Sequence, residues 1–322
     1  MIWQRNVDYL RVSITDRCNE RCRYCMPQGF RQWKSRADIL SYEEVLRVVE
    51  AAVSLGFSRF RVTGGEPLVR EGAAEFVVRL IATPGVREVG LSTNGTLLAP
   101  VAEFLARGGL RSVNVSLDAL DPDLYRRLTG GRLRDVLAGL DAARRAGIAP
   151  IKLNTVLLRG VNEGQIWPLI HYAGDHEHVL RFIELMPLSN TDRLTAASLL
   201  PLGEVMQAIG SRTEMVPDES RHGNGPAVYY RLPRHGVTVG FIGAMTNRHF
   251  CEACNKMRLT ADGKIRPCLG HHLEFDLKPA LRGMRGVTTL RETLRRALAE
   301  KPAKHLFRDH YQPGRIMTAI GG

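Results

Sequence analysis

The sequence predicts an α/β fold built on a parallel sheet. Short runs rich in β-branched residues recur six times between Tyr9 and Leu185, and helical patterns lie between them. Such alternation of strands and helices is typical of parallel sheets, and right-handed crossovers would curl the sheet. Six units are too few to close an eight-stranded barrel. After Pro187 the rhythm breaks, so a differently organised region follows.

The six repeating units can be assigned in order. Ser41 and Glu44 form a capping box at the start of the helix between the first two strands. Apolar residues at helical spacing then run from Val45 to Val53, and a second such stripe runs from Leu133 to Leu140. We expect both stripes to pack in the core. The predicted strands are Leu10–Thr15, Arg59–Thr63, Glu88–Thr93, Ser112–Leu117, Ile151–Leu157 and Leu180–Leu185.

The remaining sequence predicts a C-terminal region of mixed structure. A Gly- and Pro-rich stretch, Pro217–Pro233, precedes a predicted strand at Val237–Gly243. Thr289 and Glu292 predict the start of a helix that runs to about Glu300. We place a domain boundary near residue 190, which divides the chain into residues 1–190 and 191–322.

Composition limits the classes of function. The chain has 322 residues, 44% of them hydrophobic, and no apolar run long enough to span a membrane. Its net charge of +12 suits a polyanionic partner such as a nucleoside triphosphate, a nucleic acid or a membrane surface. No dense basic run with interleaved aromatic residues is present, which makes a nucleic-acid surface the weaker interpretation. We therefore expect neither a nucleic-acid nor a membrane partner.

All six cysteines fall into two groups of three. The first group is Cys18-x3-Cys22-x2-Cys25, and the second is Cys251, Cys254 and Cys268. A structural zinc normally takes four ligands, and iron–sulfur clusters commonly take four thiolates. Three thiolates around a cubane leave one iron without a protein ligand. A small molecule can bind to that iron, so the count of three predicts a chemical role.

Two other uses of the cysteines have to be weighed. Disulfides suit small secreted domains, whereas this chain is long and its first residues show no signal peptide, which favours a reducing, cytoplasmic setting. Zinc stays open for the second group, because Cys-x2-Cys is common in zinc sites. A fourth ligand would then come from His249, His271 or His272.

The cysteine motifs resemble those of a known family. The run from Asp16 to Pro27, with Tyr24 before its last cysteine, is similar to the cluster loop of radical S-adenosylmethionine (SAM) enzymes. The second group, the stretch Arg-Leu-Thr-x-Asp-Gly-Lys that begins at Arg258, and the tail Ile320-Gly321-Gly322 narrow the resemblance to the GTP 3',8-cyclase family. The match runs from Leu10 to Gly322. It implies a partial (β/α)6 TIM-type barrel with a C-terminal α+β domain that carries a second cluster and closes the barrel.

The resemblance also implies an activity and its partners. Each cysteine group would hold a [4Fe–4S] cluster, and the first would bind and reductively cleave SAM. The enzyme would be a radical SAM lyase that converts GTP to 3',8-cyclo-7,8-dihydroguanosine triphosphate in molybdenum cofactor biosynthesis. It would need a one-electron reductant and supply a downstream cyclic pyranopterin monophosphate synthase; a homodimer stays open. The alternative is a two-cluster radical SAM enzyme that modifies a peptide.

Candidate ligand-binding residues lie where the predicted strands end. Gly64 and Gly65 would let backbone approach a ligand closely, and Glu66 could accept a hydrogen bond from an amine. By resemblance, the SAM contacts would be Tyr24, Gly65, Ser116 and Met186, and Ser92 would lie near the substrate.

Cations within the predicted strands suggest a site for an anion. Arg11, Arg61, Lys152 and Arg181 occupy four different strands, and an unpaired guanidinium inside a barrel is unfavourable. A triphosphate could balance them, as could internal ion pairs with Glu66, Asp118 or Glu184. Lys256, Met257 and Arg258 complete the expected substrate-binding set.

The last two residues of the sequence, Gly321 and Gly322, allow two interpretations. Terminal glycines normally fray. By resemblance to the cyclase family, however, they would reach into the active-site opening and take part in catalysis.

Overall fold

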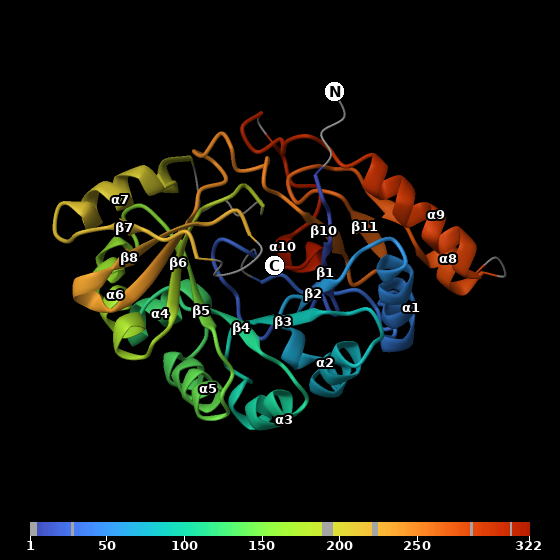
Figure 1. The fold of residues 1–322 in the computed structure, drawn as a ribbon, viewed down its shortest axis with the longest axis horizontal. Helices are drawn as coiled ribbons and strands as arrows, with labels where there is room; N and C mark the ends of the chain where they lie inside the picture. The colour runs from blue at the N-terminus through green and yellow to red at the C-terminus, as the bar shows by residue number, and fades with distance from the viewer. Residues whose placement is uncertain (1–4, 27–28, 189–195, 221–224, 284–285, 310) are drawn as a thin grey trace.

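A single sheet of twelve strands runs through the computed structural model. Its order is β12-β11-β10-β1-β2-β3-β4-β5-β6-β9-β8-β7, and it bends into an open arc (Figure 1). The structure describes residues 5–26, 29–188, 196–220, 225–283, 286–309 and 311–322. The strands are β1 Tyr9–Ser13, β2 Arg59–Thr63, β3 Glu88–Thr93, β4 Ser112–Ser116, β5 Ile151–Leu157, β6 Val179–Glu184, β7 Val216–Pro217, β8 Val228–Leu232, β9 Val237–Ile242, β10 Lys256–Leu259, β11 Lys264–Arg266 and β12 Phe275–Asp276.

The C-terminal strands extend this sheet at both edges. Strands β1 to β6 pair in parallel in chain order, as predicted. In addition, β9 pairs in parallel with β6, and β10 pairs in parallel with β1. Eight neighbouring strands therefore point the same way, although no ladder among the described residues joins β7 to β12 and closes the barrel. The boundary near residue 190 falls in 189–195, outside the described residues, and the division into two domains stays a prediction.

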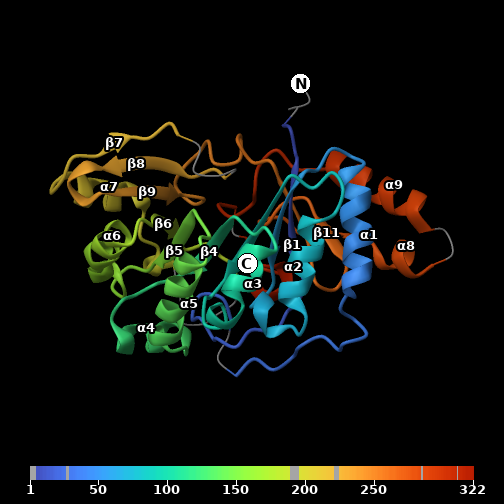
Figure 2. The same ribbon diagram turned by 60° about the horizontal axis from the view of Figure 1, so that its bottom comes forward.

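Helices cover the outer face of the sheet. Figure 2 shows α1 beside α9, and these two helices are in contact. The helix α10 lies inside the arc instead, together with the end of the chain (Figure 1). No helix among the described residues is long and apolar enough to cross a membrane. The helices are α1 Tyr42–Val53, α2 Ala73–Ile81, α3 Ala102–Arg107, α4 Pro122–Thr129, α5 Leu133–Arg145, α6 Ile166–Asp175, α7 Leu202–Gly210, α8 Lys278–Arg282, α9 Gly286–Ala299 and α10 Met317–Ile320.

Local sequence signals predicted the start of one helix correctly and the start of another incorrectly. The capping box of α1 is present: the amide of Glu44 donates to the Ser41 hydroxyl at 3.1 Å, and the amide of Ser41 donates to the Glu44 carboxylate at 2.7 Å. The prediction for α9 was wrong by three residues, because that helix begins at Gly286. Thr289 therefore lies within the helix, where its carbonyl accepts a hydrogen bond from the Thr293 hydroxyl.

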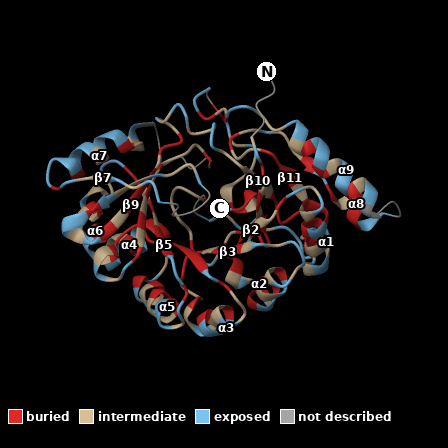
Figure 3. Ribbon diagram, in the orientation of Figure 1, coloured by how far each residue is buried: buried red, intermediate tan, exposed pale blue. Residues whose placement is uncertain are grey.

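The hydrophobic core lies between the strands and the outer helices. Figure 3 shows buried residues along the strands and on the helix faces that turn toward them. Val45, Val48 and Val49 of the first predicted stripe are fully buried, and Leu133, Val136 and Leu140 of the second belong to the same core. On β1, Leu10 and Val12 point into this core. The alternation of a strand therefore turns Arg11 to the inner face of the arc.

We predict that Gly139→Ala destabilises the protein by about 1–3 kcal/mol, because an added methyl group would overpack the contact between α5 and the turn after β3. A Cβ atom at Gly139 would lie 2.3 Å from the carbonyl oxygen of Gly95. Gly203 in α7 has no atom within 4 Å of such a position, so Gly203→Ala serves as the matched control. Urea unfolding of both variants measures the difference. Equal free energies of unfolding would contradict this packing.

Candidate functional site

Two adjoining cavities lie inside the arc. The first, here called the cysteine-loop cavity, has a volume of about 220 Å³ and is lined by Cys18, Cys22 and Cys25. The second, here called the cationic cavity, has a volume of about 260 Å³. Both are lined by Asn154, Ile183, Met186, Met317 and Gly322. A ligand in one cavity would therefore lie next to a ligand in the other.

The cysteine-loop cavity collects three free thiols. The amide of Cys25 donates to the carbonyl of Cys22 at 3.0 Å, which bends the loop so that all three side chains face inward. Burial raises the pKa of Cys18 and Cys25 to about 12, and it also raises the pKa of Cys22 well above its usual range. Thiolates bind metals, and a bound cation would offset this burial. The three thiols therefore fit a cationic iron–sulfur cluster.

Two glycines let the end of β2 approach the cysteine loop. The amide of Gly65 donates to the carbonyl of Thr15 at 2.8 Å. A Cβ atom at Gly64 would lie 2.7 Å from that same oxygen, and one at Gly65 would lie 2.3 Å from the carbonyl oxygen of Arg17. No side chain fits at either position, so the backbone itself forms this wall of the cavity.

Glu66 was predicted to accept a hydrogen bond from an amine of a ligand, but its carboxylate binds other residues of the chain. Its carboxylate accepts hydrogen bonds from the Thr93 hydroxyl at 2.8 Å and from the amide of Asn94 at 2.6 Å. It is fully buried, it does not line the cavity, and burial raises its pKa to about 7. Glu66 thus fixes the turn after β3.

The four residues expected to contact SAM all line the cysteine-loop cavity, as does Ser92. Tyr24 donates its hydroxyl to Asp118 at 2.6 Å, and the amide of Val156 donates to the other Asp118 oxygen at 2.8 Å. This pair ties the cysteine loop to β4 and β5. The buried Ser92 hydroxyl has no hydrogen-bond partner among the described residues, so it is available to a ligand.

The cationic cavity gathers positive charge from five strands. Arg11 lies in register with Arg61 on one side and with Arg258 on the other, which places three arginines in one row across β2, β1 and β10. The complete cationic set that lines the cavity is Arg11, Arg61, Lys152, Arg181, Lys256 and Arg258. Glu88 is the one carboxylate among the described residues that lines it.

The internal ion pairs that could have neutralised these cations are absent among the described residues. Glu66 and Asp118 accept hydrogen bonds from other segments of the chain, as above, and Glu184 accepts from the amides of Leu202 at 3.1 Å and Met245 at 2.7 Å. Arg61 instead donates to the Tyr9 hydroxyl at 2.6 Å and to a backbone carbonyl. Neutral acceptors thus orient Arg61 while leaving its charge uncompensated.

Burial and mutual repulsion lower the pKa values of Arg11, Lys152 and Lys256. Burial, followed by the charges of neighbouring arginines, lowers the pKa of Lys152 to about 8 and that of Arg11 to about 10. Burial also lowers the pKa of Lys256 to about 7. A bound polyanion would reverse these shifts, because opposite charge favours the protonated form. The cavity therefore fits a polyphosphate.

Two glycines on neighbouring strands make room for the arginines, which the sequence analysis did not foresee. A Cβ atom at Gly90 would lie 2.4 Å from the guanidinium of Arg61, and one at Gly240 would lie 3.1 Å from the side chain of Arg181. The sequence feature that could have revealed this packing is a glycine within a predicted strand, because such a glycine often marks the close approach of another group.

The second cysteine group lies in the wall of the cationic cavity. Lys301, which the sequence analysis missed, donates to the carbonyls of Lys256 at 2.7 Å and Pro267 at 2.6 Å, and so joins the two segments that carry the cysteines. Burial would raise the pKa of Cys254, but the charges of Lys301, Lys256 and Arg5, together with the backbone amide of Lys256, outweigh burial and lower that pKa. The amide of His305 faces the sulfur of Cys251 at 3.4 Å.

The three histidines considered as zinc ligands are His249, His271 and His272. None of them lines the cavity. His249 pairs with Glu252 at 2.9 Å, and His272 stacks on Tyr311. Among the described residues, no three ligand groups converge on the position of one metal ion. In a cubane each thiolate binds a different iron, so a triad that holds one need not converge on a single point.

The tail lies between the two cavities. The amide of Gly322 donates to the carbonyl of Gly64 at 3.2 Å, and the carbonyl of Gly322 accepts from the Thr63 hydroxyl at 2.5 Å. Arg11 also donates to this carbonyl, and Arg258 donates to the carbonyl of Gly321. Gly321 has a φ of +89°, which favours glycine. The tail is therefore held by hydrogen bonds at the site.

Met257 corrects the expected substrate-binding set. Its side chain is 1% exposed, belongs to the hydrophobic core and lines neither cavity. The alternation along β10 turns Lys256 and Arg258 inward and Met257 outward. Its side chain is thus unavailable to a ligand.

Comparison with protein families agrees with this arrangement. Residues 12–173 match the radical SAM superfamily, and residues 178–307 match the Molybdenum Cofactor Synthesis C family. The chain is also similar in fold to SuiB of Streptococcus suis, solved with its precursor peptide SuiA, with a TM-score of 0.60 over 81% of this chain and 59% of that one, at 16% identity. It is similar to anSMEcpe solved with bound AdoMet, with a TM-score of 0.60 over 93% of this chain and 82% of that one, at 15% identity. The chain belongs to the radical SAM superfamily, whose cofactors are SAM and an iron–sulfur cluster.

Similar curated proteins identify the family within the superfamily. The GTP 3',8-cyclase of Pelotomaculum thermopropionicum is 43% identical over 322 residues, which cover 99% of each chain. That of Gloeobacter violaceus is 44% identical over 325 residues, with 98% of this chain and 99% of the relative covered. Within the superfamily, the chain belongs to the GTP 3',8-cyclase family.

We predict that polyphosphate binding weakens between pH 7 and pH 9 as Lys152 loses its proton. Its lowered pKa of about 8 places that loss in this window, and the neutral amine attracts an anion less. Lys152→Arg stays charged throughout, so its affinity for tripolyphosphate should fall less over the same range. Calorimetric titration at several pH values compares the two proteins. Parallel pH profiles would contradict a role for Lys152 in anion binding.

Proposed function

We propose that this protein is a GTP 3',8-cyclase that forms 3',8-cyclo-7,8-dihydroguanosine triphosphate from GTP for molybdenum cofactor biosynthesis. The observation that carries the proposal is the pair of joined cavities, with one cysteine triad in each and uncompensated cations in the second. A radical generated at the first triad would need to travel only across their shared boundary to reach a nucleotide in the second. The proposed setting is the reducing cytoplasm, where the product passes to the downstream synthase.

The cysteine-loop cavity is the proposed SAM site. Cys18, Cys22 and Cys25 would hold a [4Fe–4S] cluster, and the backbone of Gly65 would approach the methionyl part of the ligand. Tyr24, Ser116 and Met186 would complete the contacts, since they line the same cavity. When bound, these cofactors supply a one-electron reduction and a 5'-deoxyadenosyl radical.

The cationic cavity is the proposed GTP site. The row of Arg11, Arg61 and Arg258 would bind the triphosphate, because guanidinium groups match phosphate oxygens in charge and geometry. Lys152 and Lys256 would add charge to the same contacts. Cys251, Cys254 and Cys268 would hold a second [4Fe–4S] cluster whose open iron binds the guanine ring. Ser92, in the neighbouring cavity, would lie near the ribose.

The protein's part in the reaction is to position and shield. Bound SAM would supply the radical that removes the hydrogen from C3' of GTP, and C3' would then bond to C8. One further electron and one proton complete the 7,8-dihydro product. The residues that line both cavities, Asn154, Ile183, Met186 and Met317, would hold the two ligands together and exclude water from the radical.

A peptide substrate is the weaker alternative. SuiB was solved with a precursor peptide, but a similarity at 16% identity shows only that the two folds are alike. A peptide would also bring no compensating charge to the cations that line the cavity, whereas a triphosphate supplies it.

We predict that Cys251→Ser lowers the iron content of the reconstituted protein from about eight to about four atoms per chain, because each cubane holds four irons. Reductive cleavage of SAM should persist, while the cyclised product disappears. Iron and sulfide assays, with chromatography of 5'-deoxyadenosine and of the nucleotide product, provide the measurements. A zinc ion in place of the second four irons would refute the second cluster, and wild-type protein that makes no cyclised GTP would refute the function.

We predict that deletion of Gly321 and Gly322 abolishes the cyclised product while SAM cleavage continues. The deletion removes two carbonyls that orient Arg11 and Arg258, so the substrate should lose its alignment more than its binding. Iron content, GTP affinity and product yield are compared with those of Gly314→Ala, a substitution in the same segment with no atom nearer than 3.6 Å to the new methyl. Normal product yield from the truncated protein would mean that the tail has no catalytic part.

A further inference from the structure

Lys301 contacts the second cysteine group, yet it lines neither inner cavity. The cations proposed to bind the triphosphate all line the cationic cavity, so the substrate does not account for this lysine. Lys301 lies just beyond the end of α9, where its amide donates to the carbonyl of Leu298 at 3.3 Å. Helix α9 packs on α1 and α8, so the backbone of Lys301 is held by the body of the protein.

The ammonium group of Lys301 has three donors and finds three acceptors. It donates to the carbonyls of Lys256 at 2.7 Å and Pro267 at 2.6 Å. Its third partner is the sulfur of Cys254, at 3.7 Å. Pro267 directly precedes Cys268, so both segments that carry these two cysteines bind the same nitrogen. The two carbonyls thereby fix a positive charge next to a thiol.

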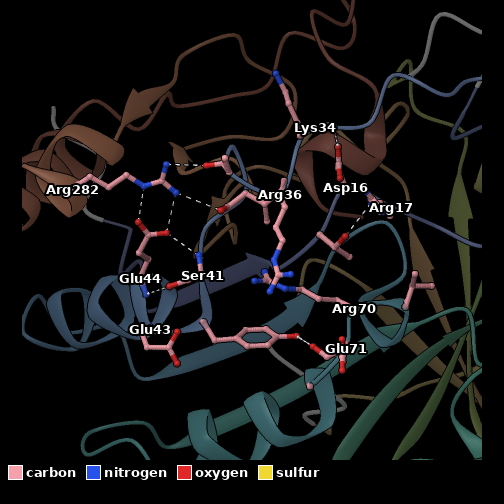
Figure 4. A pocket seen from close by; sticks show the side chains of 16 residues that line it. Asp16, Arg17, Lys34, Arg36, Ser41, Glu43, Glu44, Arg70, Glu71 and Arg282 are labelled. Carbon is pink, nitrogen blue, oxygen red and sulfur yellow. Dashed lines mark hydrogen bonds and ion pairs between the residues drawn. The ribbon is translucent and has the colours of Figure 1, made fainter.

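The charge of Lys301 is not neutralised by a carboxylate of the described residues, because its partners are two carbonyls and a sulfur. The neighbouring Glu300 pairs with Arg296 instead, at 2.7 Å. The end of α8 differs in this respect. Figure 4 shows Arg282 in contact with Glu44, a pair whose atoms lie 2.6 Å apart. The charge of Lys301 therefore acts mainly on what the cysteines hold.

A second cation ties the same segments to the start of the chain. Arg5 donates to the carbonyl of Cys251 at 3.0 Å and to the carbonyl of Pro302 at 2.5 Å. Pro302 directly follows Lys301, so Arg5 joins Lys301 and Cys251 in one unit. This second tie further limits the movement of the lysine relative to the cysteines.

The sulfurs of the first cysteine group have different neighbours. The sulfur of Cys18 accepts from the backbone amide of Glu20 at 3.4 Å. Arg21 donates to the carbonyl of Cys18 at 2.7 Å and not to its sulfur. The cavity wall also includes the carboxylate residue Glu20. Contact between a cationic side chain and a cysteine sulfur is therefore a feature of the second group.

We propose that Lys301 is a positioning residue whose fixed positive charge beside Cys254 makes the cluster of the second cysteine group easier to reduce. The inference rests on the proposed function, which assigns a [4Fe–4S] cluster to these three thiolates. Three thiolates leave the [4Fe–4S]²⁺ cluster with one net negative charge, and one-electron reduction to [4Fe–4S]⁺ leaves it with two. A nearby cation favours the more negative state, and contacts to the sulfurs are known to tune cluster potentials. A one-electron reductant such as dithionite supplies the electron, and no bond or proton changes place.

The test uses the full chain with Cys18→Ser/Cys22→Ser/Cys25→Ser, here called the host, so that the second cluster alone gives a signal. Lys301→Gln removes the charge but keeps an amide donor, and Lys301→Arg keeps the charge. The control, Lys304→Gln, removes a charge at an exposed position three residues further along. Anaerobic titration with dithionite, followed by electron paramagnetic resonance, gives the midpoint potential of each reconstituted protein. Iron content and affinity for tripolyphosphate are measured in parallel.

Lys301→Gln should make reduction of the cluster about tenfold less favourable, which lowers the midpoint by about 59 mV for one electron. Lys301→Arg and Lys304→Gln should match the host. Affinity for tripolyphosphate should stay the same in all of them, because Lys301 lines neither cavity.

Four results would overturn the inference: an unchanged midpoint in Lys301→Gln, an equal shift in Lys301→Arg or in Lys304→Gln, a tenfold loss of tripolyphosphate affinity in Lys301→Gln, or loss of its iron, which would reduce Lys301 to a structural tie. A host that holds no iron after reconstitution would refute the second cluster of the proposed function, and this inference with it. A host that holds about four irons, with a midpoint that Lys301→Gln leaves unchanged, would overturn this inference alone.

Discussion

The uncompensated positive charge inside the sheet is the constraint on which the rest of the site depends. Arg11, Arg61 and Arg258 lie side by side in register on adjoining strands. A tyrosine hydroxyl and a strand carbonyl orient Arg61, and the carbonyl of Gly321 orients Arg258. Such an arrangement is unfavourable without an anion, because desolvation and repulsion add. The protein thus retains a cavity that is stabilised when a polyanion binds, which couples substrate binding to the stability of the site.

The continuity of the sheet explains how two sequence regions build one site. Strand β10 pairs with β1, and β9 pairs with β6, so the C-terminal region supplies both flanks of the six-stranded centre. Parallel strands direct their carboxyl ends to one rim, and the cysteine loop leaves β1 at that rim. Through Lys301, the segments that carry the second cysteine group attach to the backbone at Lys256 and Pro267. Each triad is therefore fixed relative to the other through a single sheet.

The sequence was sufficient for features that depend on local or periodic signals. Three central strands, β2, β3 and β5, have the predicted bounds, and the others shift by one or two residues at their ends. Alternation along the strands was enough to turn Arg11 inward, and the same rule would have excluded Met257. The pairing of β9 with β6 and of β10 with β1 could not be predicted, because it depends on contacts between residues far apart in the sequence. The role of Glu66 was missed because its partners, Thr93 and Asn94, follow a different strand.

The tail, Gly321 and Gly322, contacts both the row of arginines and the backbone beside the cysteine loop. The amide of Thr318 hydrogen bonds to the thiol of Cys25, the amide of Gly322 binds the carbonyl of Gly64, and the carbonyls of Gly321 and Gly322 accept from Arg258 and Arg11. The peptide carbonyl of Gly321 orients the guanidinium of Arg258 but leaves its charge available. A phosphate that arrives at the row of arginines would therefore find them already aligned, and its stronger attraction lets it share or replace the carbonyl contacts. Because the same segment contacts the first cysteine loop, displacement of its end by substrate would change the contacts in both cavities.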